Sequence, residues 1–254
     1  MDKRSYLPAC WTEEWQGKLV NVHAVTTLIK GGISSGNYAE FNLATHVGDD
    51  LASVNHNRGK LCTDLQLPSE PVWLEQVHSN RVILADEKTV DERIALQADA
   101  SFTQFKGAVC AVLTADCLPV FFCNQTGTEV AVAHAGWRGL NAGIISNTVK
   151  AMNSSVDEIL VSLGPAIGPQ YFEVGTDVFE AFTDNNRLNA SAFVATDSNH
   201  FLCNIYQLAR IELQSLGIKR ITGGDYCTYR DEQKFYSFRR QQNTGRMANL
   251  IWLS

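Results

Sequence analysis

Two histidines and one cysteine are the residues of this sequence best suited to chemistry. His134 ends the apolar run AVAH, His78 ends WLEQVH, and Cys117 follows TAD. Imidazole nitrogen and thiolate sulfur are ligands that both zinc and copper accept. Two imidazoles and one thiolate around Zn²⁺ leave a fourth position open, which is the arrangement of a catalytic zinc rather than a structural one. These three side chains are therefore a candidate catalytic metal site.

Strand register gives one reason to place Cys117 beside His134. If NQTG (124–127) is a four-residue hairpin loop, residue 123 faces residue 128, and the numbers of every facing pair sum to 251. Cys117 and His134 satisfy this sum and would have Cβ atoms about 5 Å apart on one face of the sheet. Pro119 can bulge the strand and shift the pairing. Taken singly, each residue is more often an inert core or surface residue, so spacing alone leaves the site open.

Charged residues near these three could supply further contacts. Asp116 can orient a metal ligand through a hydrogen bond, or it can start a turn. An anion could be bound by guanidinium groups, although solvated arginine is the more common outcome. The candidate arginines are Arg138, Arg230, Arg239, Arg240 and Arg246. The glycine-rich stretch GGISSG lacks the GxxxxGK[ST] spacing of a phosphate-binding loop.

The whole-chain composition indicates a globular protein that acts on small molecules. The chain has 254 residues, of which 45% are hydrophobic and 19% are charged, so it can bury a sizeable core. Its net charge of −6 argues against nucleic-acid or anionic-membrane partners. No segment approaches the roughly 18 apolar residues of a membrane span, and no signal peptide is recognisable, so we expect a cytoplasmic protein. Seven cysteines without CxxC pairs predict free thiols.

The elements that must position these side chains alternate irregularly between strands and helices. Strands are predicted over 20–29, 71–79, 81–86, 107–123 (interrupted at Pro119), 129–136, 158–164, 221–229 and 235–240. Helices are predicted over 49–65, 140–152, 174–182 and 205–217. Because strict βαβ alternation is absent, we expect an α+β fold with antiparallel or mixed sheets. Without repeats or a linker, residues 1–254 are expected to form a single domain.

Several motifs stand out along the chain: LEQVHS, TADCLPV, AVAHAGWRGL, FNLATHVGDD with NHNR, LGPAIGP with YFEVG, and CTY, FYSFRR and TGR near the C-terminus. Together they resemble the motifs of the YfiH family, whose members carry a laccase domain and are described as polyphenol oxidase-like. They occur in family order and cover almost the whole chain. Two positions depart from the family pattern. Leu28 stands where many members carry arginine, and Ala166 stands where many carry cysteine.

The resemblance implies a four-layer α/β/β/α sandwich and a metal site made of His78, Cys117 and His134. It also implies phosphorolysis of adenosine, inosine and methylthioadenosine, and adenosine deamination is credited to the family as well. We expect Zn²⁺ as the cofactor, with Cu²⁺ as the alternative. Purine nucleosides and phosphate are the expected partners, and the oligomeric state stays open.

Phosphorolysis of a nucleoside needs phosphate held against C1′ and stabilisation of negative charge on the leaving base. Arg58 and Arg138 are the expected phosphate partners by charge and by their place in the motifs. The full set of expected site residues is Cys117, His134 and Arg58 in catalysis, Asn42, His46, Gln76 and Arg138 in substrate binding, and His78, Cys117 and His134 as metal ligands. Deamination would need an unusual general acid, because the HxE and PCxxC pattern of nucleic-acid deaminases is absent.

Three alternatives compete with this interpretation. A copper-dependent polyphenol oxidoreductase has a physical basis, since His₂Cys is also the blue-copper ligand set. It lacks an evident axial ligand, because none of the three methionines, Met1, Met152 and Met247, lies beside a proposed ligand. A cysteine hydrolase involved in peptidoglycan editing would use Cys117 as nucleophile and His134 as base. A binding role without catalysis is the third alternative.

Overall fold

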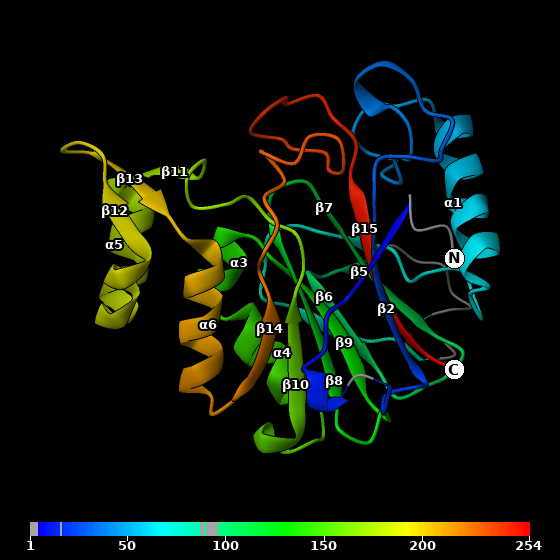
Figure 1. Ribbon diagram of the computed structural model, residues 1–254, viewed down its shortest axis with the longest axis horizontal. Coiled ribbons are helices and arrows are strands. Elements are labelled where there is room, and N and C mark those ends of the chain that lie inside the picture. Colours follow the sequence, from blue (N-terminus) through cyan, green and yellow to red (C-terminus); the bar gives the residue numbers. More distant parts are fainter. Residues whose placement is uncertain (1–4, 16, 87–88, 90–95) are drawn as a thin grey trace.

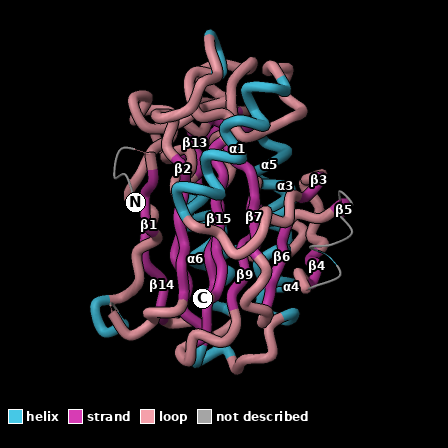
Figure 2. The backbone as a smooth tube through the Cα atoms, turned by 90° about the vertical axis from the view of Figure 1, so that its right-hand side faces the viewer, coloured by secondary structure: helices cyan, strands magenta, loops and turns pink. Residues whose placement is uncertain are grey.

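The computed structural model describes residues 5–15, 17–86, 89 and 96–254. Two β-sheets pack face to face, and helices cover the outer face of each (Figures 1 and 2). The four-stranded antiparallel sheet has the order β1 (Tyr6–Pro8), β2 (Val22–Thr27), β15 (Met247–Leu253) and β7 (Val109–Thr114). The six-stranded sheet has the order β14 (Arg220–Gly223), β10 (Ile159–Leu163), β8 (Leu118–Asn124), β9 (Val130–Ala135), β6 (Ala100–Thr103) and β4 (Val82–Leu84). It is a mixed sheet, because β10 runs parallel to β14 and β4 parallel to β6.

Helices complete the four layers. The helix α1 (Leu51–Leu65) packs Leu61 into the cluster on the outer face of the four-stranded sheet. The helices α4 (Ile144–Ala151) and α6 (Ile205–Ser215) pack on the outer face of the six-stranded sheet. The α+β class and the α/β/β/α sandwich predicted above are therefore confirmed.

Shorter elements connect these layers. They are η1 (Glu13–Trp15), η2 (Gly36–Tyr38), β3 (Leu74–Glu75), β5 (Leu96–Gln97), α3 (Trp137–Asn141), η3 (Val156–Glu158), β11 (Glu173–Gly175), α5 (Thr176–Asn185), η4 (Arg187–Ala192), β12 (Phe193–Ala195) and β13 (His200–Cys203). The strands β11, β13 and β12 form a small sheet, which lies with α5 at one end of the molecule (Figure 1). No helix of the described residues has the length and apolar character of a membrane span.

The central strands are apolar along their whole length because both of their faces are buried. Along β7, Cys110 and Val112 face the space between the sheets, whereas Ala111 faces the layer of α1. Along β9, Val130 and Val132 face the same inter-sheet space. His134 follows on this face by the two-residue period of a strand, so its imidazole lies at the end of the inter-sheet core.

The segment predicted as one strand over 107–123 is two strands in different sheets. β7 ends at Thr114 and β8 begins at Leu118, so residues 115–117 carry the chain from one sheet to the other. The break comes from Asp116, whose backbone has a positive φ of 93°. It does not come from Pro119, which lies within β8 just before the pairing with β10 begins at Val120. Cys117 is therefore placed at the crossing point between the sheets.

The predicted hairpin register is wrong by two residues. Pro119 rather than Cys117 pairs with His134, because the hairpin loop covers residues 125–128 instead of 124–127. A shift of two residues preserves which face each side chain occupies, whereas a shift of one would have reversed it. Cys117, just before the strand, is consequently still close to His134.

Two other predicted elements differ in the structure. The helix predicted over 140–152 is divided into α3 and α4 at Gly143, which has a positive φ of 85°. The strands predicted over 221–229 and 235–240 are turns and loops beyond residue 223. Among the described residues, the chain there pairs with other backbone through an isolated bridge between Cys227 and Ala166. The side chain of Arg240 binds the carbonyls of Thr228, Tyr229 and Phe235.

One further prediction about the site is corrected, and the prediction about the thiols is confirmed. The strand predicted over 71–79 contains only the two-residue strand β3, so His78 lies in a loop. All seven cysteines are described, and all are free thiols as predicted. Met1, one of the methionines considered above, lies outside the described residues.

Candidate metal centre

The three predicted ligands gather at one end of the inter-sheet core. One ligand atom from each of His78, Cys117 and His134 lies within 4.8 Å of the other two. The two imidazole rings have centroids 4.9 Å apart and are inclined at 73°. The three candidate ligands come from different places: His78 from a loop, Cys117 from the crossing between the sheets and His134 from the end of β9. Tertiary packing therefore joins three segments that are distant in the sequence.

A buried carboxylate that sequence reasoning missed holds this arrangement together. Asp99 is fully buried, and one of its oxygens accepts a hydrogen bond from His134 Nδ1 at 2.8 Å. The same carboxylate accepts the backbone N–H groups of Val77 at 3.2 Å, His78 at 3.1 Å and Ser79 at 2.6 Å. Asp99 thus orients one imidazole directly and the other through its backbone. The signal in the sequence is an acid between alanines in QADA, at the start of an apolar strand.

The backbone at the site departs from ordinary strand geometry. His78 has a φ of 59° and Asp116 a φ of 93°, both in the left-handed region. Such residues cost about 1–3 kcal/mol each and persist where surrounding contacts enforce them. The contacts to Asp99 enforce the turn at His78. The Asp116 carboxylate accepts hydrogen bonds from Thr228 and Ser237 hydroxyls and from the Arg239 N–H.

These contacts decide between the two roles considered for Asp116. Its carboxylate binds residues of the C-terminal loops, and none of its hydrogen bonds reaches His78, Cys117 or His134. Asp116 therefore shapes the crossing and draws the C-terminal loops over the site. Asp99, in contrast, bonds to two of the candidate ligands, His78 and His134.

Gly136 leaves room around the three ligands. A Cβ at this position would lie 3.0 Å from Cys117 Sγ, 3.2 Å from His78 Cδ2 and 3.4 Å from His134 Cε1. A side chain here would therefore press on all three. Together with the two-nitrogen, one-sulfur donor set, this gap fits a transition-metal ion of the zinc or copper type.

Electrostatics favours the metal-binding form of the cysteine. Removal from water alone would raise the pKa of the Cys117 thiol, but the charge of His134 and hydrogen bonds from both imidazoles lower it to about 6. Burial also opposes charge on His134, but the Cys117 thiolate and the Asp99 carboxylate raise the His134 pKa to about 9. These charges favour the thiolate of Cys117, the form that binds metals and acts as a nucleophile.

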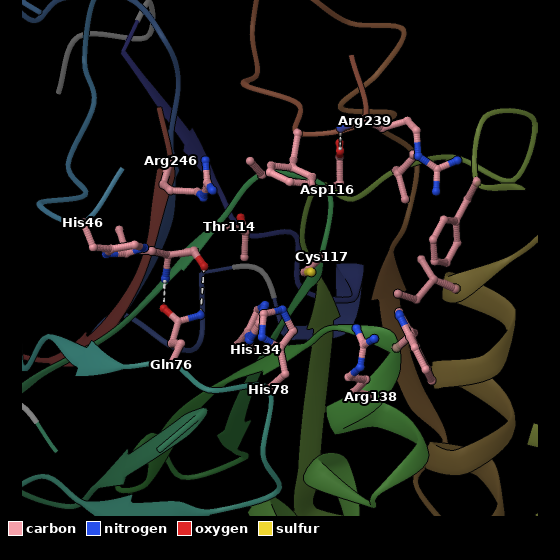
Figure 3. A pocket seen from close by; sticks show the side chains of 17 residues that line it. His46, Gln76, His78, Thr114, Asp116, Cys117, His134, Arg138, Arg239 and Arg246 are labelled. Atoms are coloured by element: carbon pink, nitrogen blue, oxygen red, sulfur yellow. Dashed lines mark hydrogen bonds between the residues drawn. The ribbon is translucent and has the colours of Figure 1, made fainter. Parts of the chain in front are cut away.

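A cavity of about 360 Å³ opens above the three ligands. Figure 3 shows His78, Cys117 and His134 between two walls. The polar wall carries His46, Gln76 and Arg246, and the opposite wall, named the aromatic wall, carries Arg138 and Arg239. Arg138 lies over the Trp137 ring and Arg239 over the Phe172 ring, and Ile205 also lines the cavity. This volume lies in the range of small-molecule sites.

The predicted substrate residues differ in their relation to this cavity. His46, Gln76 and Arg138 line it. Gln76 uses both ends of its amide on the backbone of Leu113, which fixes the loop of His78 to the end of β7. Arg138 is exposed and stacks on Trp137, with the guanidinium carbon 4.3 Å from the ring centroid.

Asn42 and Arg58 do not line the cavity. Asn42 is fully buried behind it and accepts the backbone N–H of Arg246 at 2.9 Å. Arg58 stacks on Trp73, with the guanidinium carbon 4.1 Å from the ring centroid, and donates to the carbonyl of Leu43.

The C-terminal arginines also fall into two groups, those that line the cavity and those that do not. Arg239 and Arg246 line the cavity, as Figure 3 shows. Arg230 pairs with Asp231, and Arg240 is bound to backbone carbonyls, so neither faces the site.

The chain is similar over most of its length to other proteins of known name or structure. A family model described as multi-copper polyphenol oxidoreductase laccase matches residues 23–254. The purine nucleoside phosphorylase YfiH of Escherichia coli K12 is 49% identical over 223 residues, which cover 88% of this chain and 90% of the relative. The chain belongs to the YfiH family of laccase-domain proteins.

Other members of the YfiH family confirm this assignment. A purine nucleoside phosphorylase of Pseudomonas aeruginosa is 44% identical over 243 residues, covering 95% of this chain and 97% of the relative. The crystal structure of a Neisseria meningitidis protein superposes with a TM-score of 0.90 at 42% identity, covering 98% of this chain and 99% of the other. That of the Bacillus licheniformis YfiH gives a TM-score of 0.90 at 28% identity, with coverages of 100% and 98%.

The ligands of this YfiH-family protein do not match a multi-copper centre. Among the described residues, His78, Cys117 and His134 form the only group of three histidine, cysteine or acidic ligands placed to bind a metal. Met152 is buried in the core, and Met247 sulfur accepts the backbone N–H of Tyr236. Neither methionine lines the cavity.

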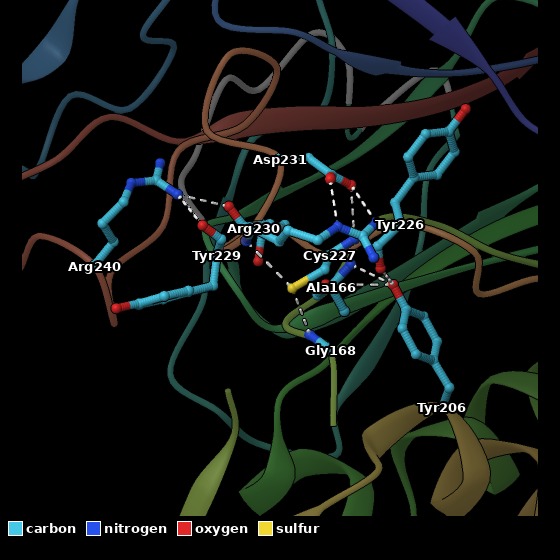
Figure 4. A network of polar contacts seen from close by, with 10 residues as sticks. Ala166, Gly168, Tyr206, Tyr226, Cys227, Tyr229, Arg230, Asp231 and Arg240 are labelled. Carbon is cyan, nitrogen blue, oxygen red and sulfur yellow. Dashed lines mark hydrogen bonds and ion pairs between the residues drawn. The ribbon is translucent and has the colours of Figure 1, made fainter. Parts of the chain in front are cut away.

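The two departures from the YfiH pattern occupy buried surroundings. Ala166 lies beside Cys227, whose sulfur accepts N–H groups from Gly168 and Arg230 (Figure 4). The Tyr206 hydroxyl donates to the Tyr226 carbonyl and accepts the Ala166 N–H. Hydrogen bonds thus join the 164–168 loop to the C-terminal segment. Leu28 packs against a small apolar cluster next to the sheet crossing.

Proposed function

We propose that this protein is a zinc-dependent purine nucleoside phosphorylase that cleaves adenosine, inosine and methylthioadenosine with phosphate. The observation that carries the proposal is a cavity that combines a metal-binding floor with the guanidinium groups of Arg138, Arg239 and Arg246. Guanidinium groups suit phosphate, and an apolar wall suits a purine. The names of the curated relatives support the same activity.

The reaction exchanges one bond at the anomeric carbon of the sugar. A phosphate oxygen bonds to C1′ while the bond from C1′ to purine N9 breaks. The electron pair of the broken bond leaves with the purine, and the proton of hydrogen phosphate ends on a purine nitrogen. The products are ribose 1-phosphate and the free base, or methylthioribose 1-phosphate when methylthioadenosine is cleaved.

The residues of this chain would contribute positioning and charge. His78, Cys117 and His134 would hold the zinc ion, which when bound supplies a Lewis acid beside the substrate. Asp99 accepts a hydrogen bond from the Nδ1–H group of His134, and this bond turns Nε2 toward Cys117 and the cavity. The cavity walls exclude bulk water and hold phosphate and nucleoside in contact.

A cysteine hydrolase is the second candidate, because one observation favours it. Asp99, His134 and Cys117 form a connected series of acid, imidazole and thiol, as in cysteine hydrolases with a catalytic triad. His78 has no part in such a triad, whereas it completes the metal ligand set. This difference makes the phosphorylase the preferred function.

One assay tests the proposal. Protein of measured zinc content is incubated with adenosine, inosine or methylthioadenosine, with and without phosphate, and the products are identified. Free base and sugar 1-phosphate that depend on phosphate and are lost after chelation are the expected result. Zinc-loaded protein that leaves all three nucleosides intact would overturn the proposal.

The same assay separates the other activities. Inosine formed from adenosine without phosphate identifies deamination at this site. Amide hydrolysis that survives chelation and is blocked by a thiol reagent identifies the cysteine hydrolase.

A further inference from the structure

We infer that Arg246 and His46, on the polar wall, form the phosphate subsite of the proposed phosphorylase, and that the purine lies against the aromatic wall. This assignment rests on the proposed function and differs from the sequence-based expectation, which gave the phosphate to Arg58 and Arg138. It follows from the burial and the contacts of each guanidinium and from the geometry of the reaction.

Arg246 is half-buried and has unused donors. Its Nη1 donates to the carbonyls of Thr244 at 2.7 Å and Gly245 at 3.0 Å. Its Nε and Nη2 have no hydrogen-bond partner, and it forms no ion pair, among the described residues. A guanidinium withdrawn from water without a carboxylate gains more from an anion than an exposed one does.

His46 provides a second donor on the same wall (Figure 3). Its imidazole has no hydrogen-bond partner among residues of the described ranges. Burial and the charges of Arg246 and Arg58 lower the His46 pKa, so the imidazole is neutral at pH 7 and offers one N–H. Arg58 adds positive potential at His46 without lining the cavity.

Buried hydrogen bonds fix the two residues relative to each other. Asn42 precedes His46 in the same loop, and its side-chain oxygen accepts the N–H of Arg246. Its amide nitrogen donates to Asp49 at 2.9 Å and to the Ala44 carbonyl at 3.1 Å. Asn57 from α1 in turn donates to the Asn42 carbonyl at 2.9 Å. The wall is therefore pre-organised, which favours binding of a compact anion.

The aromatic wall suits the flat base better than the anion. Trp137, Phe172 and Ile205 present apolar surface, and the Arg138 guanidinium lies over the Trp137 ring. Arg239 donates to the carbonyls of Tyr171 and Glu173. A guanidinium over an aromatic ring, together with further aromatic rings, offers flat surfaces on which a purine base can stack.

The reaction requires the two substrates on opposite sides. The phosphate oxygen attacks C1′ from the side opposite to the one from which the base leaves. Phosphate and base therefore occupy opposite walls when they are aligned for reaction. With the base on the aromatic wall, phosphate is placed on the wall of Arg246 and His46. The sugar then lies between them, above the three metal ligands.

The test compares Arg246→Met with Arg138→Met in the zinc-loaded protein. Binding of inorganic phosphate is measured by calorimetry, and the KM values for phosphate and adenosine are measured separately. Arg246→Met is expected to weaken phosphate binding and raise the phosphate KM by about 10- to 100-fold, with the adenosine KM nearly unchanged. Arg138→Met is expected to raise the adenosine KM and leave the phosphate KM nearly unchanged.

Three further variants guard against indirect effects. Arg246→Lys keeps the charge but loses the planar fork and should fall between wild type and Arg246→Met. His46→Gln should weaken phosphate binding by about 3- to 10-fold. Arg187→Met, an exposed position on η4, should behave as wild type.

The outcomes separate the subsite from the function. Normal phosphorolysis with an unchanged phosphate KM in Arg246→Met, or a raised phosphate KM in Arg138→Met, overturns the subsite and leaves the function intact. Phosphate binding that depends on Arg246 without any phosphorolysis overturns the function and supports the subsite. Wild-type protein that binds no phosphate overturns the subsite as well.

Discussion

At the scale of single residues, Asp99 is the most informative side chain of the molecule. Burial opposes its ionisation, yet hydrogen bonds from His134 and Ser79 hold its pKa below the usual range, so it stays charged. A buried carboxylate is stable only when its oxygens are well bonded, and Asp99 accepts five such bonds. It therefore couples the loop of His78 to the orientation of His134.

Replacing this carboxylate tests that coupling. Asp99→Asn is expected to weaken zinc binding by about 10- to 100-fold, since an amide cannot accept the same set of N–H groups. Competition with a chromogenic chelator measures the affinity directly. Asp157→Asn, an exposed acid in η3, serves as the matched control and should bind zinc as the wild type does. Equal affinity in both variants would refute the role of Asp99.

At the scale of elements, the crossing between β7 and β8 decides where the site forms. Asp116 turns the chain from one sheet into the other and places Cys117 opposite the end of β9. On the outer face of the six-stranded sheet, Glu212 of α6 accepts the N–H of Ser146 in the first turn of α4 at 3.0 Å. Burial raises the Glu212 pKa to about 7.

This contact predicts a pH dependence of stability. Because the folded pKa lies above the unfolded value, the folded state binds more protons, so the favourable contribution is present at low pH and is lost as pH rises through about 7. Glu212→Gln keeps the acceptor and removes the titration. The free energy of unfolding of this variant relative to wild type should increase by up to about 3 kcal/mol between pH 5 and pH 8, measured by urea unfolding.

A matched control is Glu180→Gln, which lies exposed on α5. Its stability relative to wild type should be the same at both pH values. A Glu212→Gln variant that showed equally little dependence on pH would contradict the assigned cause.

At the scale of the whole molecule, the proposed metal would connect separate layers. Its ligands come from the end of the six-stranded sheet, from the crossing between the sheets and from the loop that Gln76 attaches to β7. A ligand that binds the folded state and not the unfolded state stabilises a protein by about 4 kcal/mol when the free ligand concentration is 1,000 times its Kd.

Zinc removal should therefore lower the thermal midpoint of the wild type by roughly 8–16 °C. Calorimetry with and without a chelator measures the change. Cys117→Ala, which lacks one ligand, should show a much smaller response. An equal response in both proteins would place the stabilising ion elsewhere.

The sequence was sufficient for features that depend on local pattern. The donor set of His78, Cys117 and His134 was recognisable from side-chain type and motif. The helix predicted over 49–65 is α1, and Asp50 caps it by accepting the Ser53 N–H. The apolar runs of the central strands are buried as expected. These features were predictable because strand and helix periods are encoded by neighbouring residues.

Features that depend on long-range contacts were missed. The break at Asp116 needs partners from Thr228 to Arg239, more than a hundred residues away, and no local pattern reports them. The roles of Asp99 and Arg246 likewise depend on which hydrogen-bonding groups are paired, and which are left unpaired, once the layers have packed. The sequence by itself determined which side chains could bind a metal and that the central apolar runs form buried strands. Only the tertiary structure decided which distant groups meet, because hydrogen bonds between remote segments override local preference.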